Sequence, residues 1–143
     1  EIASSKQRLL QKEVEKLKKD HPIGHEAKLK NAKLSYFKGE FSLAEEHLNI
    51  LKEATSREIA NDAMDLSLLI KDNLLYDTTG AALQEFAKTE LMIFQHQDDK
   101  ALNKLNEMLT QHSGSTIIDE VLWQKSKLLL KMGKANEAVE TLQ

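Results

Sequence analysis

The stretch YFKGEFSLA at residues 36–44 decides the fold class, because it sets one glycine between two runs of helix-forming residues. Gly39 stands five residues before Ala44, and a glycine there can adopt the left-handed backbone that ends a helix. Ala32 lies twelve residues before Ala44, and small residues at this spacing let two antiparallel helices approach closely. We therefore predict a helix hairpin over residues 25–54, with its turn at Gly39.

The same spacing recurs twice more along the chain. The large apolar residues that open each copy are Leu29, Phe86 and Trp123. Three residues later stands a small residue, which is Ala32, Thr89 or Ser126. The turn residues are Gly39, His96 and Gly133, the alanines five later are Ala44, Ala101 and Ala138, and the leucines four after these are Leu48, Leu105 and Leu142. Self-similarity at a fixed spacing indicates repeats, so we predict further helix pairs over 81–112 and 118–143.

Composition favours an all-α protein of about eight helices. The 143 residues include only five glycines and one proline, too few for the turns of a β-sandwich or barrel. A first helix over 2–19, the second helix of a preceding repeat, is expected to end where Pro22 and Gly24 interrupt the pattern. An extra long helix near 55–75 is apolar on a broad face, so we expect neighbours on both sides of it.

Two helix starts carry the spacing of a capping box. Ser42 precedes Glu45 by three residues, and Thr55 precedes Glu58 by three. In a capping box each of the two side chains satisfies a backbone N–H of the first turn. We therefore expect helices to begin at Ser42 and near Thr55.

Charge and residue usage exclude several classes of function. The formal net charge is −3, and the densest basic stretch, residues 12–19, also carries two glutamates, so nucleic acid is not an expected partner. The chain has no cysteine, which excludes disulfides, thiol catalysis and zinc sites built on cysteine. The longest apolar runs, such as 66–70, are far too short for a membrane span, so we expect no membrane insertion.

No arrangement of residues predicts a catalytic, cofactor or metal site, so we do not expect an enzyme. His21, His25 and Glu26 could offer zinc ligands only on a continuous helix, and the glycine and proline between the histidines favour a loop. The paired carboxylates at 45–46, 98–99 and 119–120 fall near predicted helix starts, where the helix dipole favours negative charge.

The central stretch at 36–44 resembles a tetratricopeptide repeat, with an aromatic residue before the glycine turn, an aromatic after it and an alanine in the second helix. LKMGKANEA at 130–138 repeats this pattern, and FQHQDDKA at 94–101 is a degenerate copy. The resemblance covers roughly 26–143 and implies a single domain of helix hairpins stacked as a right-handed superhelix, an α-solenoid. The alanines are 57 and 37 residues apart, against about 34 in this repeat. We assign the first excess to the helix near 55–75.

The resemblance also implies a non-catalytic scaffold that binds a peptide, a helix or a partner repeat. The first helices of such pairs line the concave face, which places the candidate partner-binding residues at Lys33, Tyr36, Glu90, Trp123 and Lys127. Core packing is the alternative for Tyr36, Phe86 and Trp123. Leu29 and Lys33 do not match the clamp by which some of these domains hold a C-terminal carboxylate, so chaperone-tail binding is not expected.

Two other functions stay open at this point. The segment could be a structural spacer in a long solenoid that self-associates through its ends, because repeats need neighbours to cover their faces. It could also be the docking arm of an enzyme whose catalytic domain lies outside it. The chain begins and stops within predicted helices, so we expect a fragment of a longer protein. Residues 38–70 are similar to segments of large bacterial tetratricopeptide proteins, many of them exported, which favours the cell envelope over the cytoplasm.

Overall fold

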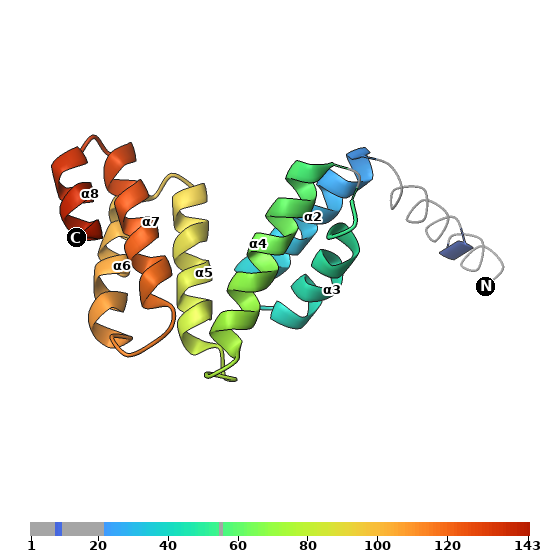
Figure 1. Ribbon diagram of the computed structural model, residues 1–143, viewed down its shortest axis with the longest axis horizontal. Coiled ribbons are helices and arrows are strands. Elements are labelled where there is room, and N and C mark those ends of the chain that lie inside the picture. Colours follow the sequence, from blue (N-terminus) through green and yellow to red (C-terminus); the bar gives the residue numbers. More distant parts are fainter. Residues whose placement is uncertain (1–7, 10–21, 55) are drawn as a thin grey trace. The chain divides into compact units, whose positions relative to one another are not determined.

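The computed structural model describes residues 8–9, 22–54 and 56–143, and within these ranges all regular structure is helical (Figure 1). The helices are α2 (Pro22–Phe37), α3 (Phe41–Leu51), α4 (Arg57–Leu74), α5 (Ala81–Phe94), α6 (Asp98–Gln111), α7 (Ile118–Lys131) and α8 (Ala135–Leu142). The prediction of an all-α protein is confirmed. The expected first helix over 2–19 lies almost entirely outside the described residues, and the other seven expected helices are found.

The three aligned turn residues share one unusual backbone conformation. Gly39 has φ of 81°, Gly133 has φ of 78°, and His96 has φ of 61°. After each turn residue, the next backbone N–H donates to the carbonyl five residues earlier: Glu40 to Ser35 at 2.9 Å, Gln97 to Met92 at 2.8 Å and Lys134 to Leu129 at 2.8 Å. This bond pattern closes a helix with a left-handed residue. The predicted turn position is therefore confirmed in all three copies.

Two expected helix starts differ from the structure. α2 begins at Pro22 rather than after Gly24, because a proline in the first turn gives up only an N–H that has no partner within the helix. α3 begins at Phe41 with Glu40 as its N-cap and without a side-chain cap, so the capping box at Ser42 is wrong.

α4 has a side-chain cap one residue later than expected. The backbone N–H of Ile59 donates to Ser56 Oγ at 3.5 Å, which places the cap at Ser56. Thr55, the expected cap, lies outside the described residues. The prediction of a capped start near this point therefore holds in kind, with Ser56 as the capping residue.

The chain divides into two compact units. Of the described residues, unit 1 takes in 8–9, 22–36, 40–54 and 56–69, and unit 2 takes in 37–39 and 70–143. The core of unit 1 is formed by α2, α3 and the first part of α4, around buried Ala32, Ala44 and Leu48. Ser67 on α4 donates to a carboxylate oxygen of Glu45 on α3 at 3.2 Å, which ties these two helices together.

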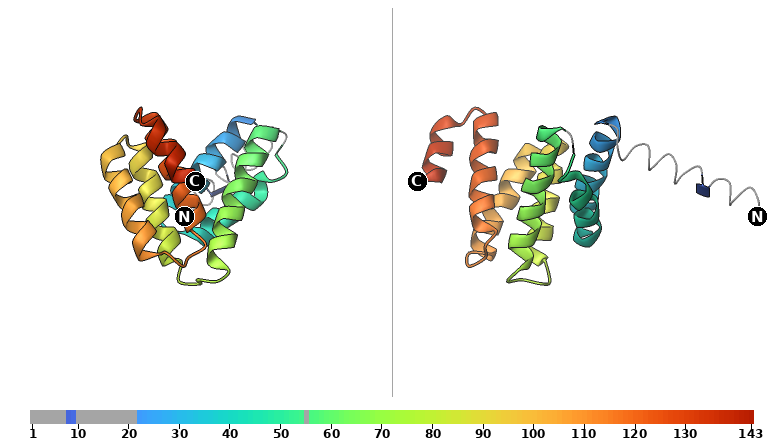
Figure 2. Two further views of the ribbon diagram at one scale, coloured as in Figure 1. Left: turned by 60° about the vertical axis from the view of Figure 1, so that its left-hand side comes forward. Right: turned by 45° about the vertical axis from the view of Figure 1, so that its right-hand side comes forward.

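Unit 2 is built by sequential packing of α5 on α6, α6 on α7 and α7 on α8. Figure 2 shows α7 and α8 as an antiparallel hairpin joined by a tight turn. The predicted close approach of the helices is direct in this pair, because Ser126 Oγ donates to the carbonyl of Ala138 at 3.4 Å. Thr116 Oγ1 donates to Asn73 Oδ1 at 2.9 Å and so ties the α6–α7 loop to the end of α4.

The long helix α4 is covered on one face only. Ile59, Ala63 and Ile70 are buried, as the expected stripe requires, but Met64 and Leu68 are 46% and 54% exposed. The helices of unit 1 therefore cover only one of the two sides on which neighbours are expected. Its broad apolar character comes from a second stripe that faces solvent.

Candidate interaction surface

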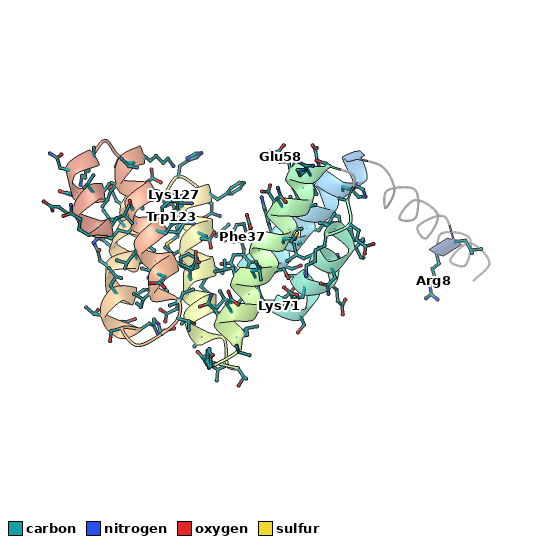
Figure 3. The ribbon with its side chains drawn as sticks, in the orientation of Figure 1. Arg8, Phe37, Glu58, Lys71, Trp123 and Lys127 are labelled. Carbon is teal, nitrogen blue, oxygen red and sulfur yellow. The ribbon has the colours of Figure 1, made fainter. Side chains whose placement is uncertain are left out.

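α7 carries a stripe of exposed side chains in unit 2, formed by Trp123, Lys127 and Leu130. Residues four and seven positions apart lie on the same face of a helix, so these three neighbour one another. The Trp123 side chain is 53% exposed, and Leu130 is exposed as well. Lys127 Nζ lies 5.9 Å from the centre of the Trp123 ring, within the range of a cation–π interaction (Figure 3).

Trp123 is exposed, unlike the residues at the same repeat position in the other two helix pairs. The aligned residue of the preceding pair, Phe86, is 1% exposed, and Leu29 of the first pair is buried. Core packing thus accounts for two of the three large apolar residues and does not account for Trp123. An aromatic side chain in this position faces solvent only in the third copy.

α5 contributes Glu90 and Phe94 to the same unit. α5 and α7 both pack against α6. Glu90 is half-buried, whereas the Phe94 side chain is 74% exposed. The Phe94 ring lies 6.3 Å, between ring centres, from that of Phe37, which belongs to unit 2. An aromatic pair therefore ends α5 at the surface.

The other two predicted partner-binding residues belong to α2 in unit 1. Lys33 is exposed there. Tyr36 is fully buried, and its ring lies 6.0 Å from that of Phe41, so it packs in the core and offers no surface to a partner. Of the five predicted residues, Glu90, Trp123 and Lys127 belong to unit 2, and Lys127 and Trp123 are in contact there.

Sequence reasoning missed Phe94 as part of the exposed surface. Its repeat position could have indicated this. Phe94 stands two residues before the left-handed turn, where the first copy has Phe37 and the third copy has Lys131. A position that accepts a lysine in one copy is at the surface, because a lysine is almost never fully buried.

Polar clusters elsewhere are small. His112 Nε2 lies 3.0 Å from a carboxylate oxygen of Glu85, which links the end of α6 to α5. His25 lies in α2 and is buried, rather than in the expected loop. Among the residues that the structure describes, no group of three or more His, Cys, Asp or Glu side chains is placed to hold a metal ion.

None of the described helices combines the length and apolar character needed to cross a membrane. Comparisons with protein-family models, with curated proteins and with solved structures found no match for this chain.

Proposed function

We propose that this chain is a non-catalytic scaffold of tetratricopeptide type that binds a protein partner through the exposed face of α7. The observation that carries the proposal is the half-exposed Trp123, held under Lys127 on a solvent-facing stripe. The partner class is a peptide, a helix or another repeat segment with apolar side chains. Nothing in this interaction requires chemistry.

A tryptophan side chain buries a large area when a partner covers it. An aromatic side chain buries roughly 150–250 Å² when it is covered. Tryptophan is also enriched among the few residues that dominate binding energy at protein interfaces. Leu130 on the same stripe adds apolar area, and Lys127 adds one cation. A partner that covers Trp123 therefore gains more here than at a typical exposed position.

The repeat assignment is part of the same proposal. It is supported by the three left-handed turns at equal register and by the buried small residues Ala32, Thr89 and Ser126. In this account the pairs α2–α3, α5–α6 and α7–α8 are repeats that stack as a right-handed superhelix, and α4 is the extra helix.

The test is a binding comparison of matched variants. Partner captured by the wild-type chain is titrated against Trp123→Ala and against Leu34→Ala, which removes a comparably exposed apolar side chain from α2. Trp123→Ala is expected to raise the Kd about tenfold or more, as at an interface hot spot, and Leu34→Ala is expected to leave it unchanged. Equal affinity of all three chains would remove Trp123 from the binding site.

A second function, a spacer that associates through its repeat faces, is favoured by one specific observation. Leu48 and Leu105 are fully buried, whereas Leu142 at the same register is 56% exposed, and Val139 beside it is exposed as well. A following helix would cover these two side chains as α7 covers α6. Light scattering across a concentration series, with Leu142→Lys as the variant, separates this function from partner binding on α7.

A further inference from the structure

The exposed face of α4 forms a second stripe, distinct from the one on α7. Asn61, Met64 and Leu68 are spaced three and four residues apart, so they lie in one row along the helix. The opposite face of the same helix is in the core of unit 1, through Ile59 and Ala63. The row therefore belongs to a helix whose orientation is fixed by its buried side.

Three carboxylates flank this row on one side. Glu58 and Asp65 are seven residues apart and share a column along the helix, and Asp62 lies beside them. All three are exposed, and Glu58 lies at the start of the helix (Figure 3). Arg57 lies in the row itself, four residues before Asn61, and Lys71 follows Leu68 by three residues. The carboxylates of α4, which are Glu58, Asp62, Asp65 and Asp72, outnumber these two cations. The stripe thus combines two exposed apolar side chains, Met64 and Leu68, with an acidic edge.

We propose that this face of α4 binds an amphipathic helix that carries basic residues along one edge. Met64 and Leu68 are exposed apolar side chains four residues apart, a spacing that matches two successive anchors of a helix bound to a partner. The acidic edge sets the sign of the complementary charge. Glu58, Asp62 and Asp65 repel an anionic lipid surface and a nucleic-acid backbone, so neither of these fits as the occupant.

The two surfaces can be tested separately. The α4 face uses residues of unit 1, whereas Trp123 belongs to unit 2. The proposal for α4 stands on the exposure and charge of its own residues. Its failure leaves the α7 proposal intact, and the reverse also holds.

The experiment titrates the chain with a dye-labelled designed helix and follows fluorescence anisotropy. The probe has about 18 residues, with leucines at spacings of three and four and lysines elsewhere, and a second probe replaces every lysine by glutamate. We expect the lysine probe to bind and the glutamate probe to fail. We also expect affinity for the lysine probe to fall as NaCl rises from about 50 to about 500 mM, because salt screens exposed charges.

Four variants locate the site. Leu68→Gln and Asp65→Lys are each expected to raise the Kd of the lysine probe about tenfold, because each removes one element of the stripe. Their matched controls on α8, Leu142→Gln and Glu137→Lys, change an exposed leucine and an exposed glutamate elsewhere and are expected to leave the Kd within about twofold. Circular dichroism of each variant confirms that the helices are kept.

Three results would overturn the proposal. The first is equal binding of the two probes, which would show that charge does not select the partner. The second is an equal loss in Glu137→Lys and Asp65→Lys, which would show that the probe responds only to the net charge of the chain. The third is loss of probe binding in Trp123→Ala with full binding in Leu68→Gln, which would place the probe on α7.

Discussion

Replacing His96 by glycine is expected to stabilise unit 2. Among the described residues, His96 is the one non-glycine residue with a positive φ, at 61°. Left-handed backbone costs such a residue about 1–2 kcal/mol, and a glycine loses about 0.5–1 kcal/mol more conformational entropy on folding. The difference predicts a rise of about 0.5–1 kcal/mol in the free energy of unfolding.

The side chain of His96 contributes little that glycine would remove. It is exposed, and the two bonds that close the turn come from the backbone, from His96 N–H to the Ile93 carbonyl at 3.0 Å and from Gln97 N–H to the Met92 carbonyl at 2.8 Å. His96→Ala is the matched control, because it removes the same side chain and keeps the backbone cost. We expect it to be no more stable than the wild type.

The assay is urea unfolding, followed by circular dichroism and by tryptophan fluorescence. The single tryptophan, Trp123, lies in unit 2 together with His96, so its emission reports on the unit that is changed. The denaturation midpoint of His96→Gly should rise with the m-value unchanged, which indicates a change in stability alone.

A reciprocal pair of variants completes this test. Gly133 has φ of 78° and no atom within 4 Å of an added Cβ, so Gly133→Ala should lose about 0.5–1 kcal/mol through its backbone alone. Gly114 has equally open space and no left-handed φ, so Gly114→Ala should lose nothing. A destabilised His96→Gly, or equal effects at the two glycines, would refute the shared turn geometry.

Three further predictions concern packing and association. Ala101→Leu should destabilise the chain by about 1–3 kcal/mol in urea unfolding, because it overfills a fully buried position between helices, whereas Ala135→Leu at an exposed position should have little effect. Thr116→Val should cost about 1 kcal/mol by removing the donor to Asn73 Oδ1, and exposed Thr78→Val is its control; equal stability of the two variants would deny that bond a role. Leu142→Lys should lower any concentration-dependent scattering of the chain, and unchanged scattering would show that the α8 face does not associate.

The sequence predicted the turns better than the helix starts. The turn positions follow from a spacing constraint, since a small residue and an alanine twelve residues apart leave one place for the left-handed residue. That constraint identified His96 even without a glycine. The sequence did not predict the start of α3 at Phe41, because this helix begins without a side-chain cap. It missed the cap at Ser56 because several polar residues of a loop can serve equally well as a cap.

The sequence could not predict which of the residues at the same repeat position are buried and which are exposed. Phe86 and Trp123 occupy the same place in their pairs, and periodicity gives both the same expectation. One is buried and the other exposed because burial depends on which elements pack against the helix, and this information is not local. The same reason explains why α4, apolar on a broad face, was expected to be covered on both sides.

Acrylamide quenching of Trp123 emission, measured for the chain with and without its captured partner, tests the binding account most directly. The account predicts strong quenching of the chain on its own, because half of the Trp123 side chain is exposed, and protection with a blue-shifted emission when the partner is bound. A Trp123 that is already protected without a partner, or one whose quenching is unchanged by the partner, would contradict the account.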